Sequence, residues 1–288
     1  MQSPRELRRR IKSVSGTAQI TKAMQMVAAS KMRKAQQAAI ATKPFAQLLY
    51  RIQRAATSRS IDFTHPLMER REVRRRAVIL VAADKGLCGA LNTNVFRIAA
   101  QFDQSSTQFI TAGRKAAQFV ARSGRRLAAE FSYGDTPTYA EARAITAFAR
   151  HLFESGEVDE VRIVTTRFVN TLSQQPISLE YLPIGAITGL PLPDGRPDHA
   201  TAADEGDTLF EPNPEAVLTY LVNHYLSIYL FYVLLNAKAS EQSARMVSMK
   251  SATDSAEDLI RGLTLEYNKL RQGNITKELL EIAGGQAE

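Results

Sequence analysis

The sequence predicts two long terminal helices that pair as an antiparallel coiled coil, with an α/β domain inserted between them. Two patterns predict the helices: an apolar heptad repeat through residues 215–283 and a second helical repeat near the N-terminus. Alternating strand and helix patterns in the middle of the chain predict the α/β domain. The predicted parts are a helix in 1–57, the α/β domain in 70–200 and a helix in 210–286.

The C-terminal repeat contains no proline and two isolated glycines, Gly262 and Gly273. Fourteen of its sixteen seam positions are apolar, a pattern typical of a coiled-coil helix. Several shorter core helices are the alternative, since an interior glycine costs a helix about 1 kcal/mol. Because the seam continues across both glycines, we favour one helix, roughly 100 Å long. The seam positions are Leu218, Leu221, Tyr225, Ile228, Tyr232, Leu235, Ala239, Gln242, Met246, Met249, Thr253, Ala256, Ile260, Leu263, Tyr267 and Leu270.

The N-terminal repeat begins at Pro4, a residue suited to the first turn of a helix, with Ser3 as its N-cap. Its apolar positions keep a three-and-four spacing as far as Lys43. We expect Pro44 to end or kink this helix, although residues 45–54 could continue it. The alanine-rich seam lets a second backbone come close, so we expect it to pair antiparallel with residues 218–249. The seam consists of Leu7, Ile11, Val14, Ala18, Ala28, Met32, Ala35 and Ala39.

The middle of the chain has the texture of an α/β domain. Residues 77–83 are continuously apolar, as in a strand buried on both faces, and a glycine-containing loop at 84–92 then opens a helix. Such alternation predicts a small Rossmann-like sheet with a parallel core. Further strands are predicted at 108–111, 126–131, 160–166 and 177–183, helices at 114–122 and 138–154, and linkers at 57–69 and 190–214.

No catalytic, cofactor or metal site is evident. Gly86 and Gly89 fit neither the dinucleotide fingerprint nor a phosphate loop, and the segment 113–115 lacks the upstream glycine and the hydroxyl that such a loop needs. Cys88 is the single cysteine, which excludes an internal disulfide and favours a packed thiol over a nucleophile. The four histidines lie far apart. We therefore predict no catalytic residue, no cofactor and no metal.

The net charge of +8 is unevenly distributed. Residues 1–60 hold thirteen Lys and Arg against one acid, or +12, which leaves 8 − 12 = −4 for the remainder. Such a segment favours an acidic partner, whether nucleic acid, anionic lipid or an acidic protein surface, although a solvated helix face is the alternative. The longest apolar run, 225–235, is too short to cross a bilayer, and Met1 precedes a charged stretch that is unlike a secretory signal.

Four segments resemble the signature segments of one family, the gamma subunits of bacterial F-type ATP synthases. They are residues 20–34, 84–92, 239–254 and 267–279, and the agreement runs in order from Met1 to about Ala283. The end of the chain, from Gly284, departs from the family's usual pairing. Plant plastid relatives have a regulatory insertion with two cysteines, so the single cysteine here implies no thiol switch.

The resemblance implies a central rotary shaft. In this family the terminal helices lie inside a ring of three alpha and three beta subunits, and the beta subunits hold the catalytic sites. The α/β domain lies outside the ring and contacts the epsilon subunit and the c-ring of the membrane sector. The chain would then be a non-catalytic subunit, peripheral on the cytoplasmic side of an inner or plasma membrane. Ion flow would turn it, and it would bind no nucleic acid.

The resemblance also implies residues that lie near beta. By the family's pattern they are Lys22, Met24, Lys31, Arg33, Arg271, Gln272 and Thr276. Two rival interpretations remain: a nucleic-acid-binding coiled coil, which leaves the α/β domain unexplained, and a nucleotide-dependent enzyme, which lacks a phosphate loop. The unequal helix lengths predict an exposed apolar stripe at the end of the longer helix, formed by Ile260, Leu263, Tyr267 and Leu270.

Overall fold

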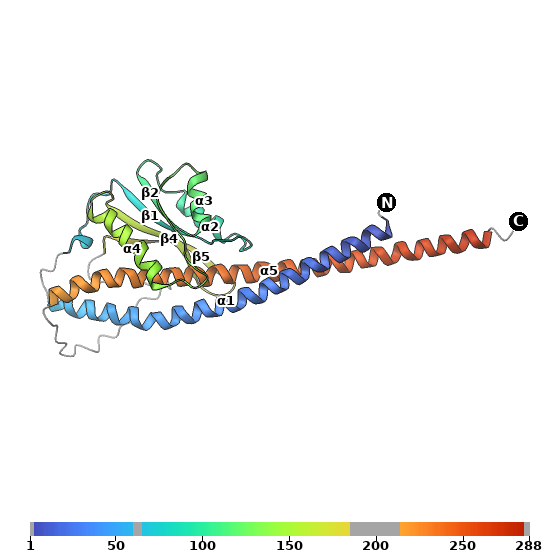
Figure 1. Cartoon of the computed structure of the whole chain (residues 1–288), viewed down its shortest axis with the longest axis horizontal. Coiled ribbons are helices and arrows are strands. Elements are labelled where there is room, and N and C mark those ends of the chain that lie inside the picture. Colours follow the sequence, from blue (N-terminus) through green and yellow to red (C-terminus); the bar gives the residue numbers. More distant parts are fainter. Residues whose placement is uncertain (1–2, 60–64, 185–213, 285–288) are drawn as a thin grey trace. The chain divides into compact units, whose positions relative to one another are not determined.

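The computed structural model describes residues 3–59, 65–184 and 214–284 (Figure 1). Two long helices, α1 (Pro4–Arg59) and α5 (Pro214–Gly284), are separated in the chain by an α/β domain. Residues 60–64 of the first predicted linker and 190–213 of the second, predicted at 190–214, lie outside the described residues. The domain's elements are η1 (Pro66–Met68), β1 (Arg76–Val81), α2 (Leu91–Ala99), β2 (Thr107–Ala112), α3 (Arg114–Arg122), β3 (Arg126–Phe131), α4 (Tyr139–Glu154), β4 (Glu160–Phe168) and β5 (Gln174–Leu182).

The five strands form one sheet in the order β3-β2-β1-β4-β5. The first four are parallel, which confirms the predicted parallel core, whereas β5 runs antiparallel to β4. A short loop, 169–173, joins β4 to β5, and so short a connection allows only antiparallel neighbours. Strand order switches between β1 and β4, because the chain first extends the sheet through β2 and β3 and then returns.

Both faces of the sheet are covered, which explains the unbroken apolar run of β1. Ala77, Ile79 and Val81 face a core that includes buried residues of α4 and α5. The alternate residues Val78 and Leu80 face a second core, formed with α2 and α3. Side chains on a strand alternate between faces, so a strand between two helical layers has no solvent-facing position. The domain is therefore three-layered, and α5 belongs to its core.

Helix α5 is continuous through both of its interior glycines, as predicted. Gly262 and Gly273 have no atoms within 4 Å of an added Cβ, so both occupy open positions on the helix. Most positions of the heptad seam are buried, and beside the sheet off-seam residues such as Leu226, Tyr229 and Leu230 are buried as well. The buried members of the seam are Leu221, Tyr225, Ile228, Tyr232, Leu235, Ala239, Gln242, Met249, Thr253, Ala256 and Leu263.

Helix α1 continues through Pro44 to Arg59. The expectation that the helix ends at this proline is therefore wrong. A proline inside a helix costs about 3 kcal/mol, and packing of α1 along α5 offsets this locally unfavourable residue. Directly before Pro44, the side chains of Ala38 and Ala39 pack on Tyr232 and Leu235 of α5. The predicted alanine-rich seam is indeed buried, at Leu7, Ala18, Ala28, Met32, Ala35 and Ala39.

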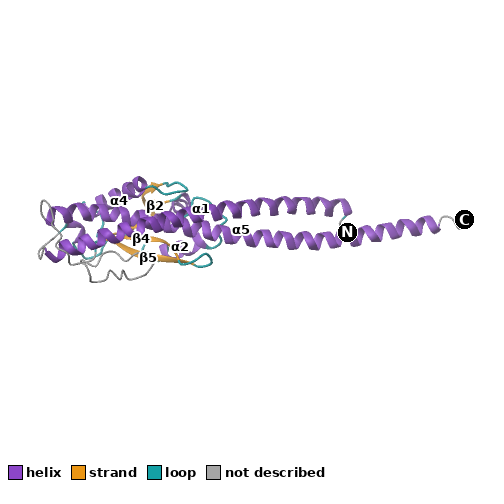
Figure 2. Ribbon diagram, turned by 90° about the horizontal axis from the view of Figure 1, so that it is seen from below, coloured by secondary structure: helices purple, strands orange, loops and turns teal. Residues whose placement is uncertain are grey.

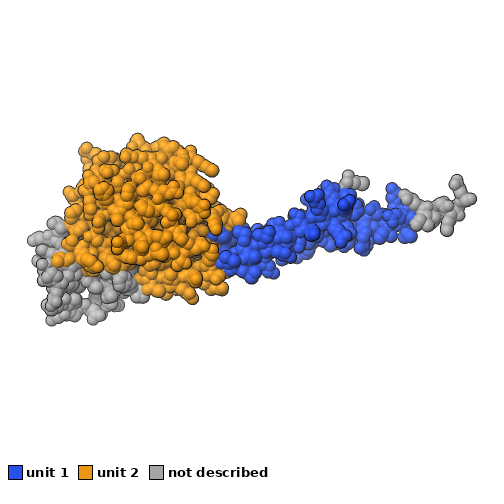
Figure 3. Space-filling model, viewed as in Figure 1, with its two compact units in different colours: residues 1–28, 245–288 blue, residues 29–244 orange. Residues whose placement is uncertain are grey.

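Two compact units divide the chain (Figure 3): residues 1–28 with 245–288, and residues 29–244. Each unit contains a segment of α1 beside a segment of α5 (Figure 2). In the first unit the hydroxyls of Thr21 and Thr253 are 2.7 Å apart, and in the second Ala39 packs on Leu235. Residue numbers fall along α5 as they rise along α1, so the helices are antiparallel. The predicted three-part division at 1–57, 70–200 and 210–286 stays a prediction.

The predicted exposed stripe at Ile260, Leu263, Tyr267 and Leu270 is wrong, because none of these four side chains is fully exposed. Leu263 is 6% exposed, and Ile260, Tyr267 and Leu270 are partly buried. With Thr21 opposite Thr253, an antiparallel pair places Pro4 opposite about residue 270, so α1 still covers this stretch. The large apolar side chains that remain exposed are Leu259, Leu265, Ile275, Leu279 and Leu280.

Replacing Gly113 with alanine should destabilise the α/β domain by about 2–3 kcal/mol. Gly113 has φ +99°, and an added Cβ would overlap the carbonyl oxygen of Ala82. The matched control is Gly262→Ala, which meets no atom and should stabilise helix α5 by up to about 1 kcal/mol. Urea unfolding followed by circular dichroism measures both variants. Equal effects of the two changes would show that the Gly113 backbone is not constrained.

Candidate partner-contact site

A polar stretch of α5 is buried directly after its apolar length. Between residues 238 and 245 the chain has charged, amide and hydroxyl side chains, yet Lys238 is 2% exposed and Glu241 is 3% exposed. Buried polar groups persist only when they are hydrogen-bonded or paired. The buried polar residues are Lys238, Ser240, Glu241, Gln242, Ser243 and Arg245.

Loops at the carboxyl ends of the parallel strands cover this stretch. After β1, Ala83, Cys88 and Leu91 form a small apolar cluster against Ala244. After β4, the carbonyl oxygen of Thr171 accepts a hydrogen bond of 2.8 Å from the hydroxyl of Ser243. In open α/β sheets ligands bind beyond the carboxyl ends of the strands, where the strand order switches. Here that switch lies between β1 and β4, and α5 contacts the loops that would surround such a ligand.

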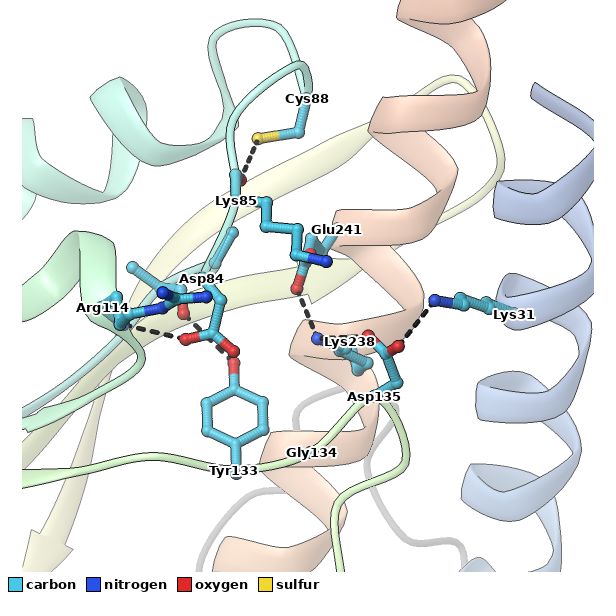
Figure 4. A network of polar contacts seen from close by, with 12 residues as sticks. Lys31, Asp84, Lys85, Cys88, Arg114, Tyr133, Gly134, Asp135, Lys238 and Glu241 are labelled. Carbon is cyan, nitrogen blue, oxygen red and sulfur yellow. Dashed lines mark hydrogen bonds and ion pairs between the residues drawn. The ribbon is translucent and has the colours of Figure 1, made fainter. Parts of the chain in front are cut away.

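The N-terminus of α3 is capped by a carboxylate of the same chain. Asp84, in the loop after β1, accepts a hydrogen bond of 2.9 Å from the backbone N–H of Arg114 (Figure 4). The N-terminus of a helix carries a partial positive charge and often binds phosphate. In this domain a carboxylate of the chain itself takes that place.

One carboxylate joins both long helices to the α/β domain (Figure 4). Asp135 follows β3; its Oδ2 lies 2.6 Å from Nζ of Lys31 in α1, and its Oδ1 lies 3.6 Å from Nζ of Lys238 in α5. Lys238 Nζ is also 3.0 Å from Oε2 of Glu241, one turn further along α5. We call Lys31, Asp135, Lys238 and Glu241 the ion cluster. It contains two cations and two carboxylates, so its charges balance.

Tyr133 connects the ion cluster to the sheet. Its ring lies 5.4 Å from Lys238 Nζ, within the range of a cation–π contact. Its hydroxyl donates a hydrogen bond of 3.2 Å to the carbonyl oxygen of Ala82, directly after β1. Burial, together with the nearby charges of Glu241 and Asp84, raises the pKa of the Tyr133 phenol well above its usual value. The phenol therefore keeps its proton at neutral pH.

The hydrogen bond from Lys31 lowers the pKa of the Asp135 carboxyl. Partial burial opposes this shift, and the positive charge of Lys238 adds to it. Because the pKa is lowered on folding, the ionised carboxylate stabilises the fold above its unfolded pKa. That contribution is lost as the pH falls through the folded pKa.

The predicted contact residues do not gather into one site. Met24 is partly buried, and Lys31 belongs to the ion cluster, where its side chain is 37% exposed. Within the described residues, no group of His, Cys, Asp and Glu could hold a metal ion. The role of the seven predicted contact residues near beta stays a prediction, and so does the expected lack of a cofactor and a metal. The remaining contact residues are all exposed: Lys22, Arg33, Arg271, Gln272 and Thr276.

Sequence reasoning missed Tyr133, Asp135, Lys238 and Glu241. One signal was present, since Lys238 and Glu241 are three residues apart, directly after an apolar stretch of the helix, and so share a face. Asp135 offered no signal, because a single acidic residue in a loop is common on protein surfaces.

Comparison with known proteins identifies the family. The profile described as "ATP synthase" matches residues 3–287. The ATP synthase gamma chain of Opitutus terrae is 45% identical, with 99% of this chain and 98% of that one covered. The gamma chain of Heliobacterium modesticaldum is 39% identical, with 100% and 99% covered.

Solved structures show the same fold at lower identity. A chain of the Euglena gracilis mitochondrial ATP synthase rotor has a TM-score of 0.65 at 19% identity, over 94% of this chain and 98% of that chain. A chain of the Tetrahymena thermophila mitochondrial ATP synthase central stalk and c-ring has a TM-score of 0.59 at 22% identity, over 81% and 99%. Because the family profile and the curated gamma chains match nearly all of it, this chain belongs to the ATP synthase gamma chain family. Both the resemblance and the predicted fold class are confirmed.

Replacing Glu241 with leucine should destabilise the chain by about 3 kcal/mol, because it leaves the buried Lys238 without its nearest carboxylate. The double variant Lys238→Met/Glu241→Leu removes both charges and should lie much closer to the parent in its free energy of unfolding. Urea titration of the four proteins completes a double-mutant cycle. Additive losses would mean that the two side chains do not form a coupled pair.

Proposed function

We propose that this chain is the central rotary shaft of an F-type ATP synthase. It couples ion flow through the membrane sector to ATP synthesis or hydrolysis on the beta subunits of an alpha3beta3 ring. One observation supports this most: α5 is continuous for 71 residues and extends past the start of α1 with leucines exposed. Identity of 39–45% to ATP synthase gamma chains over nearly the whole chain supports the same function.

A shaft changes the conformation of its neighbours only if its contacts differ between rotational positions. The paired region presents two helices, whereas beyond about residue 270 α5 presents one. The exposed surface of α1 combines basic residues with apolar ones, namely Ile20, Met26, Val27 and Ile40. Long-ranged charge and shallow apolar contacts suit a surface that must leave each partner easily.

The proposed contacts with beta are Lys22, Met24, Arg33, Arg271, Gln272 and Thr276, together with Lys31. The exposed members are free to contact a partner directly. Lys31 differs, because its ammonium is bound to Asp135. We therefore assign Lys31 an indirect role, in which it sets the position of the neighbouring α1 surface.

The chain itself is proposed to be non-catalytic, with the catalytic sites on the beta subunits. Helix α5 contacts the loops after β1 and β4, where a ligand of such a sheet would bind, and this supports the proposal. The carboxylate of Asp84, which takes the place of a phosphate at the start of α3, supports it as well. The further partners are the alpha subunits, the epsilon subunit and the c-ring, and nucleic acid is not among them.

The proposed location is the cytoplasmic side of an inner or plasma membrane, as a peripheral protein held there through the complex. Among the described residues no helix is long and apolar enough to span a membrane. The Tetrahymena and Euglena chains of the same fold come from the central stalk and the rotor of their enzymes.

The purified full-length chain should neither hydrolyse ATP nor bind it at micromolar concentration. A phosphate loop is missing, and α5 contacts the loops where a ligand of an α/β sheet would lie. Isothermal calorimetry with ATP and magnesium, and a phosphate-release assay, measure the two properties. Micromolar binding to the chain alone would contradict this prediction.

Serine substitutions at Leu265, Ile275, Leu279 and Leu280 together should weaken assembly with the alpha3beta3 ring or lower ATP-driven torque. These side chains are exposed at the end of α5, so the paired helices should keep their helical content. A control with Glu266, Lys277 and Glu278 changed to serine alters the same exposed turns without removing apolar surface. Unchanged assembly and rotation in the variant with four serine substitutions would show that these apolar side chains make no functional contact with the ring.

The proposed function is tested directly by reconstitution. The chain is combined with alpha and beta subunits, the ring is fixed to a surface, and a bead on the α/β domain reports ATP-driven rotation. Rotation in steps, absent when the chain is omitted, is expected. A ring that assembles with the chain and hydrolyses ATP without rotating it would overturn the proposal.

A further inference from the structure

We propose that Asp135 is a positioning residue that fixes α1 in register with α5 and thereby lets the α/β domain turn both helices as one body. The register part rests on the geometry of residues 29–244, and the turning part rests on the proposed function. Every residue of the ion cluster belongs to this one compact unit.

The alanine-rich seam of α1 gives close packing with little steric definition of register. Ala28, Ala35 and Ala39 are buried, and Met32 is the one large side chain among them, so this part of the seam resists sliding by one turn less than a row of large side chains would. Polar groups at a helix interface specify register, because a shifted alignment leaves them unpaired. Within the described part of α1, Lys31 supplies such a group, and its partner comes from the α/β domain.

The two helices are attached to the domain unequally. Helix α5 contributes an apolar face, including Leu226, Tyr229, Leu230 and Val233, to the main core of the domain. Among the α1 side chains that the structure describes, residues 4–42, none belongs to the two cores that flank the sheet. The ion pair of Lys31 with Asp135, at 2.6 Å, therefore fixes a length of α1 that these cores do not hold.

The Asp135 side chain is 57% exposed, and it also lies near a second, buried cation. The buried ammonium of Lys238 lies 3.6 Å from its other oxygen, and Glu241 and the ring of Tyr133 hold Lys238 in turn. A path of direct contacts thus leads from the end of β1 through Tyr133, Lys238 and Asp135 to Lys31. A force applied to the domain reaches α5 through the core and α1 through this carboxylate.

Disulfide trapping in the full-length chain tests the register. On a Cys88→Ser background, Thr21→Cys is combined with Thr253→Cys, the pair in contact, or with Met249→Cys or Ala256→Cys, one turn to either side. Asp135→Asn should raise the yield of the shifted pairs relative to the Thr21–Thr253 pair by roughly two- to fivefold, the range expected for a partly exposed ion pair. Lys31→Met should do the same, and the double variant should add nothing further.

Two variants serve as controls in the trapping experiment. Asp135→Glu keeps a carboxylate and should restore the parent yields. Asp103→Asn changes an exposed aspartate of the same domain whose bonds go to Ser105 and Ser106, and should have no effect. Helical content, followed by circular dichroism, shows whether each variant is folded. Because Lys31→Met leaves the loop after β3 intact, a folding failure of Asp135→Asn alone does not remove the test.

The second measurement uses the whole ATP synthase in proteoliposomes. Asp135→Asn and Lys31→Met should lower ATP-driven ion pumping per ATP hydrolysed by roughly twofold or more, whereas Asp135→Glu and Asp103→Asn should leave this ratio unchanged. Unchanged trapping yields in both variants overturn the proposal outright. If the trapping yields shift while ion pumping per ATP hydrolysed stays unchanged, the claim that the α/β domain turns both helices as one body is overturned. If the parent chain shows no coupling at all, the proposed function fails, and the trapping yields still decide the register.

Discussion

The α/β domain is built around one apolar length of α5, which is buried against the sheet. Residues from Leu221 to Ala237 join the core formed by β1, β4 and α4, so this helix is at once part of a domain core and part of a helical pair. Burial of aromatic and aliphatic side chains is the dominant favourable term in folding. It fixes where α5 leaves the domain, and it brings the following polar stretch beside the loops at the carboxyl ends of the strands.

That polar stretch explains how a fold used widely for ligand binding can serve a mechanical part. The loops after β1 and β4, where a doubly wound sheet would surround a ligand, here pack on Ala244 and accept a hydrogen bond from Ser243. Asp84 supplies the negative charge that a phosphate would bring to the start of α3. The ligand crevice has become an attachment surface for this stretch of α5.

The two long helices differ in how they are held, and the difference suits their chemistry. Helix α5 has large side chains and an extensive core contact, whereas α1 has a small-residue seam, an ion pair from Lys31 and a hydroxyl pair at Thr21. Small side chains permit close approach but define register weakly, so polar contacts supply the definition. The outward side of α1 is left with exposed basic and apolar residues that are available to partners.

The architecture could be predicted from the sequence, because heptad spacing and continuous apolar runs indicate directly which side chains must be buried. The sequence located the seams of both helices, the two-sided burial of β1 and the parallel core, and its signature segments identified the family. The sequence did not reveal that α1 continues through Pro44 or that Leu263 is covered, since both depend on packing between helices far apart in the chain. The ion cluster belongs to the same class. Lys31, Asp135 and Lys238 come from three separate segments, and no local pattern reveals that one carboxylate meets two lysines.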